Sequence, residues 1–73
     1  MATCTVTIRD RDGRPFTTTT AGASLFEVVR DAVEFFRHPF WKGPRPANET
    51  TLEVSVIGSG RSYRVRVGRV TGW

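Results

Sequence analysis

The residues that could carry covalent or acid–base chemistry are one cysteine, one histidine and a pair of neighbouring aspartates. To act as a nucleophile, Cys4 would need a nearby base and a group that stabilises its thiolate, and its neighbours in the chain supply neither. His38 follows Arg37 at the end of an expected helix, where a cation favours the helix dipole. Asp10 and Asp12 lie in a segment of turn-forming residues, which accounts for them without a catalytic role. We therefore expect a protein that is not an enzyme, with no catalytic residue, no bound metal and no cofactor.

Length, composition and cysteine content limit the class of protein. The chain has 73 residues, of which 38% are hydrophobic and 25% charged, and this size and balance predict one folded domain over residues 1–73. One cysteine cannot form an internal disulfide, which favours a compartment that keeps thiols reduced. The first residues lack the charged and apolar stretches of a secretory signal, and no apolar run approaches the roughly 20 residues that cross a bilayer. We therefore expect a cytoplasmic protein with no membrane partner.

The positive charge is concentrated at one end of the chain. The net charge is +4, and residues 1–60 contain seven basic and seven acidic residues, so the excess lies in residues 61–73. A basic strip of this kind can attract the phosphates of nucleic acid. The competing interpretation is a general bias toward arginine, since ten of the eleven basic residues are arginine. The residues of this C-terminal arginine strip are Arg61, Arg64, Arg66 and Arg69.

The first third of the chain predicts a hairpin. Residues 4–8 alternate apolar and polar side chains, as expected for a strand with one buried face. Turn-forming residues occupy 10–15, and residues 16–20 form the returning strand. Because Pro15 precedes that strand and most of its residues are polar, we expect it to lie at an edge of the sheet.

Two registers are compatible with this hairpin. A two-residue Asp12-Gly13 loop pairs Ile8 with Thr17 and points Phe16 outward. A five-residue loop pairs Ile8 with Thr18 and points Phe16 inward. We favour the longer loop, because burying a phenylalanine side chain contributes about 1.5–3 kcal/mol.

A helix is predicted from Leu25 to about Arg37. Ser24 and Glu27 have the spacing of a capping box, in which the hydroxyl accepts from the Glu27 amide and the carboxylate accepts from the Ser24 amide. Pro39 disfavours helical geometry at the residue before it and ends the helix. The apolar stripe predicted to face the core consists of Phe26, Val29, Val33 and Phe36.

The rest of the chain predicts a long connection and a second hairpin. Residues 38–50 contain three of the four prolines and have no periodicity. Residues 51–57 and 62–67 alternate around a Gly-Ser-Gly turn, as in a hairpin with a two-residue Ser59-Gly60 loop. The cross-strand pairs predicted by that loop are Val56 with Tyr63, Val54 with Val65, Leu52 with Val67, and Glu53 with Arg66.

The order strand, strand, helix, strand, strand predicts an α+β fold. It resembles that of the β-grasp domains over nearly all of residues 3–70. The resemblance implies a four-stranded mixed sheet, with the first and last strands adjacent and parallel and one helix packed on one face. The alternatives are an antiparallel four-stranded sheet of other strand order and a dimer that shares a sheet.

The functional branches of the β-grasp fold do not match this chain. Ubiquitin-like modifiers and sulfur carriers end in Gly-Gly, whereas this sequence ends in Thr71-Gly72-Trp73. Ferredoxin-type members need four cysteines for their cluster. The sequence also resembles short bacterial proteins of unknown function that combine a Thr-Val-Thr strand, an Asp-x-x-Gly turn, a Ser-Leu-aromatic-Glu helix start and a final tryptophan.

An aromatic and basic segment at residues 35–45 is the most distinctive feature of the sequence. It either folds back onto the core or presents anchors to a partner, because tryptophan and arginine dominate interface hot spots. We expect a non-enzymatic protein-interaction or assembly module whose partner is another protein or a second copy of the chain. The edge strand 16–20 could also accept a strand of that partner. Nucleic-acid binding by the arginine strip, weak and salt-sensitive, is the alternative. The expected protein-contact residues are Val28, Phe35, Phe40, Trp41 and Trp73.

Overall fold

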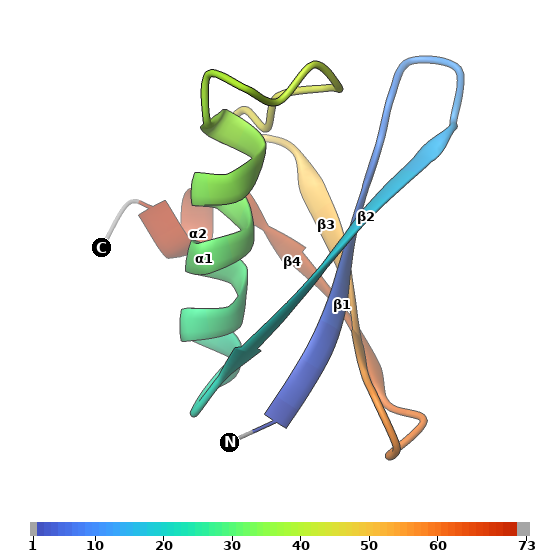
Figure 1. Cartoon of the computed structure of the whole chain (residues 1–73), viewed down its shortest axis with the longest axis vertical. Helices are drawn as coiled ribbons and strands as arrows, with labels where there is room; N and C mark the ends of the chain where they lie inside the picture. The colour runs from blue at the N-terminus through green and yellow to red at the C-terminus, as the bar shows by residue number, and fades with distance from the viewer. Residues whose placement is uncertain (1, 72–73) are drawn as a thin grey trace.

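The chain folds as two hairpins with a helix between them (Figure 1). The computed structural model describes residues 2–71, and the side chains of residues 2–69. The elements, in chain order, are β1 (Ala2–Arg9), β2 (Pro15–Gly22), α1 (Leu25–Arg37), β3 (Thr51–Val56), β4 (Ser62–Arg66) and α2 (Val67–Thr71). The α+β class is therefore as predicted. So is the succession of the four strands and the long helix along the chain.

The strand order corrects the expected topology. The four strands lie in the order β2-β1-β3-β4, and every neighbouring pair is antiparallel. The β-grasp arrangement, with the first and last strands adjacent and parallel, is not formed, and the antiparallel alternative is the one observed. Placing β3 beside β1 brings Glu53 within 3.5 Å of Arg9. The parallel arrangement would have set the arginines of β4 on the strand next to Arg9, at a cost in like-charge repulsion.

The first hairpin confirms the longer loop and the inward-facing Phe16. Arg9 pairs with Pro15, which leaves a five-residue loop, Asp10–Arg14. Ile8 pairs with Phe16, whereas Thr18 was the predicted partner. Because this difference is an even number of residues, each side chain keeps its predicted face.

The second hairpin is shifted by two residues from the predicted register. The observed loop is Ile57–Gly60, closed by a 2.9 Å hydrogen bond from Val56 N–H to the Arg61 carbonyl. A two-residue type I′ loop needs a positive φ at both central residues. The positive φ values are at Gly58 (+90°) and Gly60 (+72°), so Ser59 cannot serve as such a residue. The observed pairs are Leu52 with Val65, Glu53 with Arg64, Val54 with Tyr63, and Ser55 with Ser62.

Helix α1 has the predicted bounds and nearly the predicted cap. The Ser24 hydroxyl accepts from Glu27 N–H at 3.3 Å. The Glu27 carboxylate accepts from Ala23 N–H at 2.8 Å, one residue earlier than a capping box requires. The first contact satisfies an amide of the first helical turn, and the second satisfies an amide just before the N-cap.

The core lies between α1 and the inner face of the sheet, as the apolar stripe predicts. Val29, Val33 and Phe36 are buried, and Phe26 is half-buried against the same cluster. Val28 is also buried, with 1% of its surface exposed, which corrects its expected role as a contact for a partner. The full set of buried core residues is Cys4, Val6, Ile8, Val28, Val29, Ala32, Val33, Phe36, Leu52, Val54 and Val67.

The chain turns from strand to helix at Val67, which was predicted to continue β4. Val67 N–H donates to the Thr50 carbonyl at 2.9 Å, and Gly68 N–H donates to the Asn48 carbonyl at 2.8 Å. A Cβ at position 68 would lie 2.9 Å from the Asn48 oxygen, so this close approach requires glycine. α2 packs beside α1 and brings the fully buried Val67 into the core (Figure 1).

Replacement of Phe36 and of Phe40 by alanine tests this arrangement of the core. Phe36 is fully buried, so Phe36→Ala should lower the free energy of unfolding by about 3–5 kcal/mol, through lost burial and the cavity left behind. Phe40 is 56% exposed, so Phe40→Ala should cost much less. Urea denaturation followed by circular dichroism measures both. Equal losses of stability would contradict the described core.

Candidate functional site

Cys4, Asp10 and His38, which were considered for covalent or acid–base chemistry, take part in core packing or in local hydrogen bonds. Cys4 is buried in the core. Asp10 Oδ1 accepts from the amides of Asp12 and Arg14, both at 2.9 Å, so this carboxylate organises the turn. His38 Nδ1 accepts from Phe40 N–H at 3.3 Å. Within residues 2–71, no three histidine, cysteine, aspartate or glutamate side chains come together in a group that could hold a metal ion.

Trp41 folds back onto the core. Its ring centroid lies 5.2 Å from that of Phe36 and 5.9 Å from that of Phe16. The indole Nε1–H donates to the Pro44 carbonyl at 2.9 Å. A Cβ at Gly43 would lie 2.5 Å from the indole ring, so the loop can close over the tryptophan because residue 43 is glycine. Trp41 therefore covers the space between helix and sheet at the C-terminal end of α1.

The arginines of the same segment are held within it. Arg45 donates to the carbonyls of Arg37, at 2.8 Å, and Trp41, at 3.0 Å. Arg37 in turn donates to the Pro46 carbonyl at 3.3 Å. These contacts satisfy a carbonyl at the C-terminal end of α1 and fix the path of the loop after it.

The expected protein-contact residues do not form one exposed surface. Phe35 is half-buried and packs against Phe36, with ring centroids 5.5 Å apart. Phe40 is exposed and contacts Phe35 and His38, with centroids 5.4 and 4.5 Å away. Trp73 lies outside the described residues. With Val28 in the core and Trp41 over it, Phe40 is the one of the four described candidates that presents most of its surface to a partner.

An apolar groove lies at the other end of the helix, and of the expected protein-contact residues only the buried Val28 is on its described lining. It has a volume of about 270 Å³. Tyr63 of β4 is on its lining with 40% of its surface exposed, and Leu25, at the start of α1, is 38% exposed. The residues that line the groove are Ala2, Cys4, Gly22, Ala23, Ser24, Leu25, Val28, Val56 and Tyr63.

The groove follows from the width of the helix. A helix with its side chains is about 10–12 Å across, and neighbouring strands are about 4.8 Å apart, so one helix covers little more than two strands. α1 lies mainly over β2 and β1, and β4 contacts α2 at its far end. Tyr63, near the start of β4, therefore lacks a helical cover. The signal in the sequence was the presence of four strands with one long helix.

β4 also presents an open backbone edge. The hydrogen bonds of Val56 with Arg61, and of Val67 with Thr50, fix which β4 residues face β3, because these pairs alternate along an antiparallel ladder. Backbone groups at positions 63 and 65 face β3, and those at 62, 64 and 66 face outward. The carbonyl of residue 66 precedes α2 and is the acceptor for its first turn. The open groups are thus the N–H and C=O of residues 62 and 64 and the N–H of residue 66.

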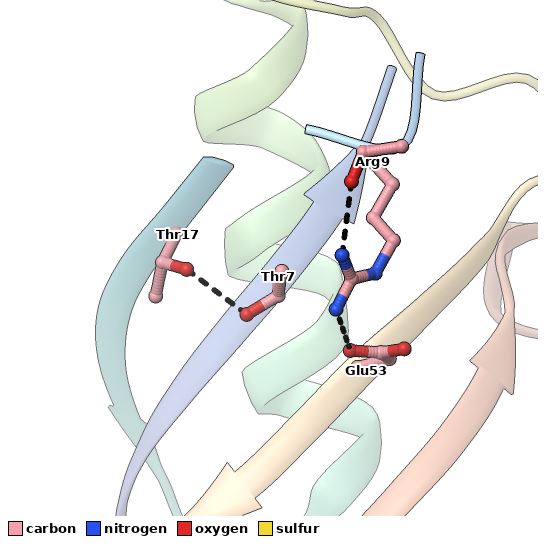
Figure 2. A network of polar contacts seen from close by, with 5 residues as sticks. Thr7, Arg9, Thr17 and Glu53 are labelled. Carbon is pink, nitrogen blue, oxygen red and sulfur yellow. Dashed lines mark hydrogen bonds and ion pairs between the residues drawn. The ribbon is translucent and has the colours of Figure 1, made fainter. Parts of the chain in front are cut away.

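The outer face of the sheet carries a row of polar contacts that stops at β3. Figure 2 shows Thr17, Thr7, Arg9 and Glu53 side by side on β2, β1 and β3. The Thr7 and Thr17 hydroxyls are 3.0 Å apart, and Arg9 donates to Glu53 at 3.5 Å. Among the described residues this is the one ion pair. The side chains of β4 take no part in the row.

Three of the four residues of the arginine strip come together. Arg64, Arg66 and Arg69 line a shallow depression of about 520 Å³ with Thr51 and Val65. Arg61 precedes β4 and does not line this depression. Since Glu53, opposite Arg64 in the sheet, is engaged by Arg9, the depression keeps a positive charge.

Comparison with protein-family models, with curated proteins and with solved structures finds no match to this chain. In the part of the chain that the structure describes, no helix has the length and apolar character to span a membrane.

The reactivity of the Cys4 thiol tests how deep the groove is. Cys4 lines the groove but is 3% exposed, so we expect reaction with Ellman's reagent at least tenfold slower in the native protein than in urea. Absorbance at 412 nm measures the rate. A native rate equal to the denatured one would show that the groove opens as far as β1.

Proposed function

We propose that this protein is a non-enzymatic protein-interaction module that accepts an extended segment of another protein at the edge of β4. The observation that supports this most directly is the coincidence of open backbone groups at residues 62–66 with the exposed ring of Tyr63. Strand addition supplies main-chain hydrogen bonds for affinity and side-chain contacts for specificity.

The edge of β4 is better suited to this role than the edge of β2, which the sequence had suggested. β2 begins with Pro15, which has no N–H to donate. Its inner face is covered by α1, and its outward side chains are two threonines, a proline and an alanine. β4 has an incompletely covered inner face, so an added strand there would gain apolar burial as well as hydrogen bonds.

The expected affinity is modest. The five open backbone groups could each contribute about 0.5–1.5 kcal/mol net, against the cost of ordering an extended segment. The edge is short because α2 begins at Val67. A dissociation constant in the micromolar range or weaker follows, which suits reversible assembly. We place this assembly in the cytoplasm, a proposal that rests on a single, buried, unpaired cysteine.

Nucleic-acid binding is the second candidate, supported by the depression between Arg64, Arg66 and Arg69. It is less well supported because recognition of bases on a sheet uses exposed aromatic rings. The outward positions of the four strands hold no aromatic residue.

Two proline variants test the proposed edge against the other one. Arg64→Pro removes an outward N–H without breaking the ladder with β3, and Thr19→Pro does the same on the outer edge of β2. Peptides of 12 residues selected from a displayed random library on the native protein should bind Arg64→Pro at least tenfold more weakly. They should bind Thr19→Pro with less than a threefold change.

Amide chemical shifts and titration by calorimetry provide the measurement, with circular dichroism as the check on folding. Selected peptides that bind Arg64→Pro as well as the native protein would contradict the β4 edge. Loss of binding in Thr19→Pro alone would assign the site to β2. Light scattering of the free protein adds a third outcome, since a stable dimer would make a second copy of the chain the partner.

A further inference from the structure

We infer that the segment accepted by β4 alternates acidic and apolar residues. This inference rests on the proposed function and adds the chemistry of the partner. It follows from what the two faces of β4 present: arginine side chains outward, and Tyr63 and Val65 inward.

The outward face of β4 has an unbalanced positive charge. Arg64 faces Glu53 across the sheet, but the Glu53 carboxylate lies 3.5 Å from Arg9 on the opposite side (Figure 2). Within residues 2–71, no carboxylate forms an ion pair with Arg64, Arg66 or Arg69. An added strand is the next neighbour of β4, so its outward side chains would lie directly beside the arginines.

The spacing of the arginines matches that of an extended segment. Side chains on one face of a strand repeat every second residue, about 6.6–6.8 Å apart. Arg64 and Arg66 are two residues apart on one face of β4. Glutamates at alternate positions of an added strand would therefore pair with both at once, and Arg69 lies beyond the end of β4 where a further carboxylate can meet it.

The opposite side of the same segment must be apolar. Its inward side chains would lie against Val65, which is half-buried, and Tyr63, which is 40% exposed at the groove. A valine or isoleucine there would cover apolar surface that α1 does not reach. Side chains of a strand alternate between the two faces, so the two requirements give an acidic–apolar alternation.

The same charges disfavour a second copy of the chain. Two β4 edges paired with each other would set arginines of one copy beside arginines of the other, and like charges opposite each other destabilise a sheet. Charged edge residues commonly prevent such self-pairing. Here they prevent it while attracting a segment of opposite charge.

The test uses short synthetic peptides and the full chain. The probe is an acetylated, amidated hexapeptide of sequence Glu-Val-Glu-Val-Glu-Val, compared with Gln-Val-Gln-Val-Gln-Val and Glu-Pro-Glu-Pro-Glu-Pro. The acidic alternating peptide should bind at least tenfold more tightly than either, because the second lacks charge and the third lacks N–H groups. Amide shifts should move most at residues 62–66, and binding should weaken as NaCl is raised from 20 to 500 mM.

Charge reversal with a matched control assigns the contact. The double variant Arg64→Glu with Arg66→Glu should bind the acidic peptide at least tenfold more weakly than the native chain, equivalent to 1.4 kcal/mol. Arg11→Glu with Arg14→Glu changes the net charge equally in the distant β1–β2 loop and should change binding less than threefold. A Lys-Val-Lys-Val-Lys-Val peptide should bind the first double variant and not the native chain. Such a rescue shows that the variant is folded.

Each other outcome overturns a defined part of the proposal. Equal binding of the glutamine peptide would reject the acidic partner and leave strand addition standing. Equal binding of the proline peptide would reject strand pairing itself. Binding of a single-stranded 12-nucleotide DNA or RNA more tightly than the acidic peptide, lost in Arg64→Glu with Arg66→Glu, would assign the arginines to nucleic acid.

Discussion

The packing of one helix on four strands is the constraint on which the rest of this structure depends. A helix is about twice as wide as the spacing between strands, so α1 covers β1 and β2 and leaves the other side of the sheet to smaller groups. Val67 in α2 covers part of what remains, whereas Trp41 packs at the side of β2, against Phe16. Tyr63 and the edge of β4 lie where this cover ends, and an open apolar groove is therefore next to the most basic strand.

Local sequence patterns predicted the four strands, the long helix and their faces, because each depends on neighbouring residues, but they did not predict α2. The cap at Ser24, the stripe that ends at Phe36 and the inward Phe16 all follow from spacing along the chain. The strand order did not follow, because either strand of the second hairpin could lie beside β1. An ion pair between Arg9 and Glu53 agrees with the observed choice, and it joins residues far apart in the sequence.

The aromatic segment shows why site residues were harder to predict than elements. Its composition is that of a binding surface. However, Arg45 and the indole of Trp41 donate hydrogen bonds to nearby carbonyls, and Gly43 lets the loop close. None of these contacts has a periodic pattern. The groove beside Tyr63, in contrast, could have been anticipated by asking how many strands a single helix can cover.

The position of β1 has a consequence for the order in which the chain can acquire its structure. β1 is an inner strand, and its second neighbour, β3, is separated from it by the whole of β2, α1 and the loop that follows. During synthesis, the first hairpin and helix emerge before residues 51–56, and one side of β1 then has no neighbour in the chain. Until β3 arrives, the nascent protein exposes a strand whose final place is inside the sheet, and late pairing over such a distance slows folding.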